Sequence, residues 1–357
     1  MHEMSSTTTG VPPRGASDAP GAGERRGGRG RARRNGLIAG IAAALLTAVA
    51  ACGGGAAATA PSTAPGPSAA ASADVFPQTL KSQYGETTLK AAPQRVVAIG
   101  VAERDTTLAL GVTPVAVGGY GPIDSWFTAA AGGKTVENID ITDGIPFEKI
   151  AGFQPDLIIT GWGQEADYAQ LSKIAPVLWQ VSDTFTTKWR DQVTTIATTL
   201  GKSAEGQKLV ASTDDRIKAT AAANPGFKGK TFTWSTYDPG LINTVDLPGA
   251  PVISFLGDLG LALKPGLGNP QSTYSKEVSV EKLADIDANV IIIYPSSPEA
   301  KADLEGQRTW QSLAGVKAGG AVFLDDALAN GLNSPTLLSI PYVLDKLTPM
   351  LAQATKA

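Results

Sequence analysis

Short apolar runs alternate with amphipathic stretches through the first part of the region that is expected to fold. Four runs are rich in Val and Ile, are closed by Gly or a polar residue, and have the length of strands: residues 95–100, 112–119, 155–161 and 176–182. Three segments between them have helical spacing of apolar residues: 103–111, 146–154 and 165–175. Strands buried on both faces and separated by helices predict parallel βαβ units.

A second region repeats this pattern after residue 229. Strands are predicted at residues 230–237, 289–296 and 320–326, and helices at 251–259, 280–286 and 336–351. The helix–strand segment 148–159 aligns without gaps on 281–292, and most aligned positions are identical or similar. An internal repeat at this long spacing predicts two similar domains.

A helical connector lies between the two regions. Its two helical stretches are divided at residues 201–203, where Ser203 is a candidate N-cap, and Asn224-Pro225-Gly226 ends the second stretch. A helix of about twenty residues is roughly 30 Å long, which is the width of a small domain. We therefore expect an α/β fold of two Rossmann-like lobes with mostly parallel sheets, joined by one long backbone helix.

The first fifty residues have the three parts of an export signal. An arginine-rich segment precedes an apolar stretch at 37–49, which is too short to span a membrane comfortably. The segment Val49-Ala50-Ala51-Cys52 resembles a bacterial lipobox, in which the cysteine is lipidated and becomes the first residue of the mature protein. A plain secretory signal with an incidental cysteine is the alternative. Arg33-Arg34 also leaves twin-arginine export open beside the general route.

These features predict the domain organisation. The expected parts are a signal peptide at 1–51, a disordered tether at 52–75, an N-terminal lobe at 76–183, a connector at 184–226 and a C-terminal lobe at 227–357. The tether is predicted from low-complexity Ala, Gly, Pro, Ser and Thr, and as a random coil it reaches on the order of 25 Å.

Composition limits the kinds of catalytic site, metal site and partner that the chain can have. The one histidine, His2, lies in the predicted leader, so the mature chain has no histidine for a catalytic triad, a general base or a metal site. The one cysteine is Cys52. Removing the basic leader makes the chain more acidic than its full-length net charge of −3, which argues against nucleic acid as a partner. A carboxylate-based hydrolase stays open, although Asp325-Asp326, the nearest acidic pair, is better interpreted as a solvated turn.

Aromatic residues gather at the ends of the predicted strands. In open α/β sheets ligands bind beyond the carboxyl ends of the strands, so these rings predict a cleft for a large, partly apolar ligand. The candidate ligand-binding residues are Arg104, Tyr120, Trp126, Trp162, Trp234, Tyr237, Tyr274 and Tyr294. Arg104 offers a cation to an anionic ligand oxygen, and an ion pair with Glu103 or Asp105 is its alternative role.

Three stretches carry a resemblance to a known family. Residues 93–119, 143–178 and 278–294 resemble, in order, the periplasmic-binding-protein domains of iron–siderophore and cobalamin uptake, most closely the iron–siderophore substrate-binding lipoproteins of ABC transporters. The resemblance implies the two-lobed fold with a helical backbone that defines class III of these proteins. It also implies a ferric siderophore held between the lobes with no protein metal ligand or cofactor, and delivery to an ABC permease dimer.

The family also implies a docking role for two acids. A carboxylate on each lobe contacts arginines of the permease, and the matching positions are Glu148 and Glu281 at the start of the internal repeat. Helix-starting acids that only complement the helix dipole are the alternative. An arginine that hydroxamate binders often carry before the first of these helices is missing from residues 141–144, which places direct arginine contact with a hydroxamate in doubt.

The function expected from the sequence is a binding protein, not an enzyme. We expect a monomeric lipoprotein, anchored through Cys52 at the outer face of the cytoplasmic membrane, that feeds a ferric siderophore to an importer. A neutral or weakly charged complex fits the few cations at strand ends better than a highly anionic catecholate. Cobalamin, haem bound through tyrosine, or a surface sensor without a permease are the alternatives.

Overall fold

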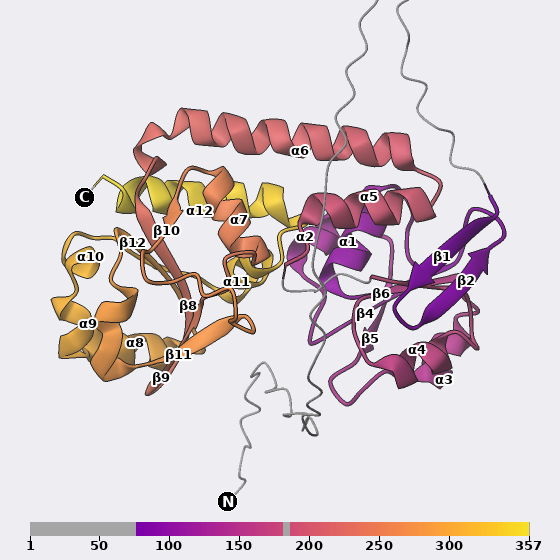
Figure 1. Cartoon of the computed structure of the whole chain (residues 1–357), viewed down its shortest axis with the longest axis horizontal. Helices are drawn as coiled ribbons and strands as arrows, with labels where there is room; N and C mark the ends of the chain where they lie inside the picture. The colour runs from indigo at the N-terminus through magenta and orange to yellow at the C-terminus, as the bar shows by residue number, and fades with distance from the viewer. Residues whose placement is uncertain (1–75, 181–185, 357) are drawn as a thin grey trace, which may run out of the picture. The chain divides into compact units, whose positions relative to one another are not determined.

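The computed structural model describes residues 76–180 and 186–356 (Figure 1). The N-terminal lobe contains a five-stranded sheet of order β5-β4-β3-β6-β7 in which every neighbouring pair is parallel. The chain builds it from β3 (Val96–Ile99), α1 (Val101–Ala109), β4 (Ala116–Gly119), α2 (Ser125–Ala130), β5 (Glu137–Asp140), α3 (Phe147–Gly152), β6 (Leu157–Thr160), α4 (Glu165–Leu171) and β7 (Val177–Trp179). Every residue of β3 and β6 is buried, as the apolar runs predict.

The C-terminal lobe contains a mixed sheet of order β11-β9-β8-β12-β13, with β10 paired to β8. Strands β8, β10, β12 and β13 are parallel, whereas β9 pairs antiparallel with both of its neighbours, β8 and β11. The elements are β8 (Thr231–Asp238), β9 (Leu241–Val245), α7 (Pro251–Asp258), β10 (Ala262–Leu263), β11 (Ser275–Ser279), the 3-10 helix η2 (Val280–Ile286), β12 (Val290–Pro295), α8 (Pro298–Gly306), α9 (Arg308–Ser312), α10 (Ala314–Lys317), β13 (Ala321–Phe323), α11 (Asp326–Asn333) and α12 (Ser339–Ala354).

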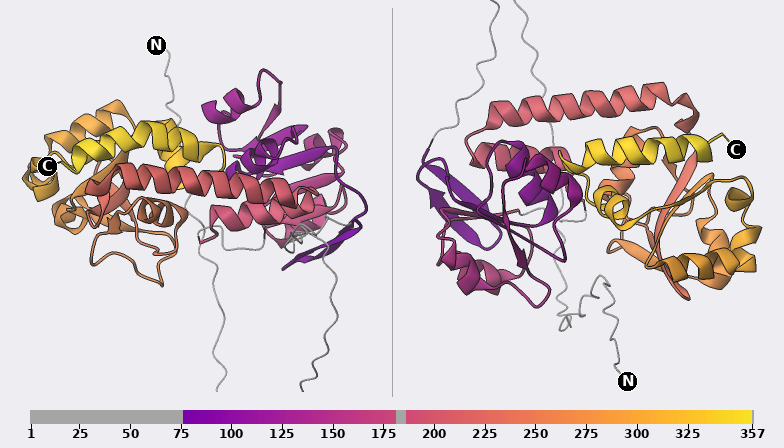
Figure 2. Two further views of the ribbon diagram at one scale, coloured as in Figure 1. Left: turned by 90° about the horizontal axis from the view of Figure 1, so that it is seen from above. Right: turned by 180° about the vertical axis from the view of Figure 1, so that it is seen from behind.

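Helix α6 (Ser203–Ala223) is the long backbone helix, and the two-lobed α/β fold expected from the sequence is confirmed. It packs on α5 (Trp189–Thr199) at one end and on α7 and α12 at the other (Figures 1 and 2). Gly206 lets α5 approach, because a Cβ there would lie 2.5 Å from the Ala197 Cβ.

Lys202, not Ser203, occupies the N-cap position of α6. A short 3-10 helix, η1 (Pro225–Phe227), follows where the proline was expected to end the helix.

The predicted internal repeat corresponds to the same unit in each lobe. In the N-terminal lobe α3 leads into β6, and in the C-terminal lobe η2 leads into β12. Each of these strands pairs in parallel with the first long strand of its sheet, β3 or β8. The predicted helix at 280–286 is a 3-10 helix, since Lys282 leaves helical geometry.

The hairpin of β1 (Gln78–Ser82) and β2 (Gly85–Leu89) was not predicted. Its inward-facing leucines, Leu80 and Leu89, pack with the strands β3, β6 and β7. Tyr84 at its turn packs edge-on against Trp179, with ring centroids 5.2 Å apart. The described part of the chain includes no helix that is both long and apolar enough to span a bilayer.

Candidate ligand-binding site

The carboxyl ends of the parallel strands place two exposed aromatic rings side by side in the N-terminal lobe. Tyr120 follows β4 and is 50% exposed, and Trp162 follows β6 and is 39% exposed. Their rings meet edge to face with centroids 5.6 Å apart. Within the described residues, the third large apolar side chain that is exposed is Leu241, at 37%. Leu241 begins β9 opposite Asp238, the last residue of β8, so it lies at the corresponding edge of the other sheet.

Arg104 is buried in an ion-pair network instead of being presented to solvent. Its guanidinium pairs with Asp124 through Nη2 and with Asp105 through Nε, the latter at 3.4 Å. It also lies over the Phe127 ring, 5.7 Å from the centroid. The alternative role for Arg104, an ion pair with the neighbouring Asp105, is present in the structure, and Asp124 adds a second ion pair.

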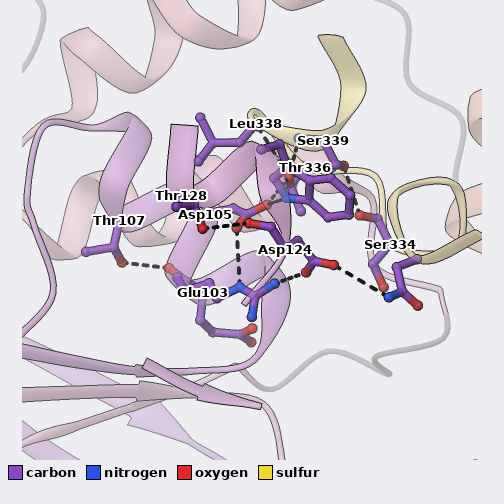
Figure 3. A network of polar contacts seen from close by, with 12 residues as sticks. Glu103, Asp105, Thr107, Asp124, Thr128, Ser334, Thr336, Leu338 and Ser339 are labelled. Atoms are coloured by element: carbon purple, nitrogen blue, oxygen red, sulfur yellow. Dashed lines mark hydrogen bonds and ion pairs between the residues drawn. The ribbon is translucent and has the colours of Figure 1, made fainter. Parts of the chain in front are cut away.

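Asp105 joins the two lobes through buried hydrogen bonds (Figure 3). It accepts from Trp126 Nε1 at 2.9 Å within the N-terminal lobe and from Thr336 Oγ1 at 2.6 Å, just ahead of α12. Trp126 also packs on Tyr342 of α12, with ring centroids 5.4 Å apart. Burial raises the pKa of Asp105 to about 6, although Arg104 and the two hydrogen bonds act in the opposite direction. Trp126 is thus an inter-lobe contact.

Glu103 is a buried acid at the carboxyl end of β3. Gly100, which precedes α1, has a φ of 121° and leaves space that the Glu103 carboxyl occupies. A Cβ on Gly100 would lie 2.8 Å from Glu103 Cδ and 3.1 Å from Trp162 Nε1, so the carboxyl and the indole of the exposed Trp162 both lie beside Gly100. Burial raises the pKa of Glu103 to about 7.

The raised pKa of Glu103 predicts a pH-dependent stability. Because the folded-state pKa lies above the ordinary value of 4.5, the native state holds this proton more tightly, and the resulting stabilisation is complete below pH 4.5 and is lost as pH rises through about 7. Glu103→Gln imitates the protonated acid at every pH. We expect it to match the wild type near pH 4.5 and to exceed its unfolding free energy at about pH 8 by on the order of 1–3 kcal/mol. Urea unfolding at both pH values measures this, and a constant difference between the two proteins would contradict it.

Tyr294 and two acids lie at the carboxyl edge of the C-terminal sheet. The Tyr294 hydroxyl donates to Asp326 Oδ1 at 3.1 Å, at the first residue of α11. Burial and the charges of Asp326 and Asp238 raise the pKa of Tyr294 to about 12. The neighbouring Asp325 caps α11 by accepting from the Leu328 N–H at 2.8 Å. The pair Asp325-Asp326 therefore forms the turn that begins this helix, as interpreted from the sequence.

Three other predicted aromatic residues lie within the C-terminal lobe. Trp234 and Tyr237 are 2% and 0% exposed, because β8 continues to Asp238 and its side chains point to the covered faces of the sheet. Tyr237 donates to Asp303 of α8. Tyr274 precedes strand β11, not a helix, and it donates to Asn333 Oδ1, which Trp234 Nε1 also approaches at 3.4 Å. These positions differ from the expected cleft lining.

The two candidate docking acids are exposed and lie on separate lobes. Glu148 is in the first turn of α3, and Glu281 is in the first turn of η2. Hydrogen bonds from its own backbone N–H and from Ser279 lower the pKa of Glu281, which keeps it ionised. Cys52 and the predicted signal and tether lie outside the described residues.

Sequence reasoning did not single out Asp124, Asp238 and Leu241 as residues of these edges, and it considered Glu103 only as an ion-pair partner and Asp326 only as part of a solvated turn. The available indication was that Asp238 directly follows the predicted strand 230–237, and that Leu241 and Asp124 lie in the segments just beyond predicted strands. Residues 76–180 and 186–356 contain no group of three or more His, Cys, Asp or Glu arranged to hold a metal ion.

Comparisons by sequence and by structure find relatives of the same kind. Residues 96–328 match the family described as Periplasmic binding protein. The probable siderophore-binding lipoprotein YfiY of Bacillus subtilis is 26% identical over 280 residues, which cover 73% of this chain and 85% of that protein. The iron uptake ABC transporter substrate-binding protein PiaA of Streptococcus pneumoniae is 30% identical with a TM-score of 0.68, over 78% of this chain and 99% of that structure. PiaA in complex with ferrichrome is 28% identical with a TM-score of 0.69, over 78% of this chain and 98% of that structure.

The family match extends from the first strand of the N-terminal sheet into α11 of the C-terminal lobe, more than half of the chain. The structural match to PiaA adds the two-lobed arrangement. The resemblance seen in the sequence is therefore confirmed, and the chain belongs to the periplasmic binding protein family, whose members are substrate-binding transport proteins.

Proposed function

We propose that this chain captures a ferric siderophore between the carboxyl edges of its two sheets and delivers it to an ABC importer. The observation that carries the proposal is the position of the exposed large apolar side chains. Within the described residues these are Tyr120, Trp162 and Leu241, and all three lie at the carboxyl edges, where open α/β sheets bind ligands. The relatives named for siderophore binding and for a ferrichrome complex support this ligand class.

The proposed activity is binding without catalysis. The siderophore surrounds its iron with its own ligands, so the protein needs apolar contact area and hydrogen bonds in place of metal ligands. The edge-to-face pair of Tyr120 and Trp162 offers such area on one lobe, and Leu241 and the Tyr294 hydroxyl offer a smaller counterpart on the other. The organic shell of a ferric siderophore is large and partly apolar, so it matches the surfaces on both lobes.

The partner and location follow from the same proposal. Glu148 and Glu281 are exposed carboxylates, one on each lobe, and are proposed to contact the two subunits of a permease. Cys52 is proposed to carry the lipid that holds the protein, as a monomer, at the outer face of the cytoplasmic membrane. The relative named as a lipoprotein supports this location.

Ligand binding is expected to quench the fluorescence of Trp162. Titration of the protein from residue 74 onward with ferric siderophores should give saturable quenching, because a ligand that covers the exposed indole changes its surroundings. Trp162→Phe should remove most of this change, whereas Trp310→Phe, which alters a buried indole of the C-terminal lobe, should retain it. Saturable quenching by cobalamin or haem together with no response to any siderophore would contradict the proposed ligand class.

A further inference from the structure

Carboxylates dominate the carboxyl edges of both sheets. Glu103, Asp105 and Asp124 lie at the edge of the N-terminal sheet, and Asp238 and Asp326 lie at the edge of the C-terminal sheet. The two edges are adjacent, because Asp105 accepts from Thr336 and Asn330 of α11 lies 3.5 Å from Asp124. A ligand held between the edges therefore experiences the charges of both.

The cation within this group is already neutralised. Arg104 is 3% exposed and pairs with both Asp124 and Asp105, so these three residues together retain a negative charge. Among the described residues, no lysine or arginine forms an ion pair with Glu103, Asp238 or Asp326. A negatively charged ligand would meet carboxylates with no available counter-charge.

The acids of the C-terminal lobe are accessible to a ligand. Asp238 and Asp326 are exposed, and the half-buried Tyr294 interacts with both, because its hydroxyl lies 3.1 Å from Asp326 and the charge of Asp238 helps to raise its pKa. An ammonium group has three donors and one positive charge, and two carboxylates with a hydroxyl oxygen provide acceptors for it. This arrangement matches a primary ammonium in both charge and hydrogen bonding.

Glu103 gives an independent indication on the other lobe. It is 4% exposed, its own backbone N–H donates a hydrogen bond to its carboxyl, and no lysine or arginine of the described residues forms an ion pair with it. Burying a carboxylate that has no cation as a partner is costly. Its carboxyl and the indole N–H of the exposed Trp162 both lie beside Gly100, so a positively charged ligand at Trp162 would stabilise it.

Resting on the proposed function, we propose that this site selects ferric complexes that carry a positive charge, and that the substrate class is a trihydroxamate bearing a free ammonium. Three hydroxamates balance the charge of ferric iron, so the ammonium makes the complex a cation. A tris-catecholate complex is instead a trianion. Asp238 and Asp326 bind the ammonium, while Tyr120 and Trp162 contact the hydroxamate shell.

A pair of ligands that differs in this one charge tests the proposal. Ferrioxamine B carries a free ammonium, and its N-acetyl derivative has the same iron shell without the charge. We expect the cation to bind roughly tenfold more tightly, the effect of one favourable charge contact near a protein surface. The preference should shrink at about 0.5 M salt, where exposed charges are screened. Calorimetry or tryptophan quenching measures both affinities.

Variants identify the residues that produce the preference. Asp238→Asn with Asp326→Asn should bring the two ligands to equal affinity, chiefly by weakening the binding of ferrioxamine B. Asp215→Asn, which neutralises an exposed acid of α6, is the matched control and should keep the preference. Because these acids are exposed, folding is retained, and Glu103→Gln supplies a second, buried test of the same preference.

The outcomes separate this inference from the proposed function. Equal binding of ferrioxamine B and its N-acetyl derivative, or tighter binding of a ferric tris-catecholate, overturns the charge preference and leaves siderophore capture intact. Failure of every ferric siderophore to bind overturns the proposed function itself. A preference that persists in the Asp238→Asn, Asp326→Asn protein overturns the assignment of the ammonium site.

Discussion

Replacing Glu148 and Glu281 together with alanine is expected to abolish siderophore uptake while leaving siderophore affinity unchanged. Both side chains are exposed, and each lies in the first turn of the helix that opens one copy of the internal repeat. Two like charges at equivalent positions on two similar lobes fit a permease with two similar subunits. Removing both charges takes away one contact with the permease on each lobe. Charged contacts raise the rate at which two proteins associate, so the binding protein should no longer dock on the permease efficiently.

The measurement compares iron uptake in cells with binding by the purified protein. The double variant should transport at the level of a strain that lacks the protein, yet its dissociation constant for the ferric siderophore should equal that of the wild type. Glu165→Ala with Glu299→Ala is the matched control, because these are also exposed acids in the first turn of a helix, one in each lobe. Normal transport by the Glu148→Ala, Glu281→Ala protein would show that the acids only complement their helices.

Trp126→Ala is expected to cause the largest loss of stability among single substitutions at the lobe interface. Trp126 is 6% exposed, packs on Tyr342 of the other lobe and donates to the buried Asp105. Truncation leaves a cavity and removes a hydrogen bond from a buried carboxylate, so the unfolding free energy should fall by about 3–5 kcal/mol. Urea unfolding followed by circular dichroism measures the change.

Trp126→Phe separates the contribution of side-chain packing from that of the hydrogen bond to Asp105. Phenylalanine retains most of the contact with Tyr342 but lacks the N–H that Asp105 accepts, so the loss should be about 1–3 kcal/mol. Thr336→Val removes the hydroxyl donor from the other lobe at nearly constant volume and should have a similar effect. A loss below about 1 kcal/mol for Trp126→Ala would contradict the inter-lobe role given to this residue.

The strands and helices were largely predictable because they depend on local periodicity. The buried strands β3, β6 and β12 are continuous apolar runs, and α6 is a long helical pattern with a proline just beyond its end. The hairpin β1–β2 was missed because each of its strands buries only one residue, which leaves the pattern almost entirely polar. Strand β11 has an equally weak pattern, since it also buries a single residue.

Residues that the sequence proposed together for the ligand site have different surroundings in the structure. Tyr120 and Tyr237 look alike in the sequence, since each is an aromatic residue near a strand end. Tyr120 lies one residue beyond β4 and is exposed, whereas Tyr237 lies inside β8 and is fully buried under the helices of its lobe. The exact end of a strand therefore decides whether an aromatic residue near it is exposed at the edge of the sheet or buried in the core.

The sequence by itself determined the α/β class, the two lobes and the backbone helix, because each depends on patterns between neighbouring residues. The tertiary structure decided which charges are available at that edge. Arg104 is neutralised by Asp124, and Asp105 contacts Thr336 from across the chain, 231 residues away. Such pairings result from the packing of distant elements, which no local pattern specifies. Because of them, the positive charge expected of Arg104 is neutralised, and carboxylates dominate the charged groups at the edge.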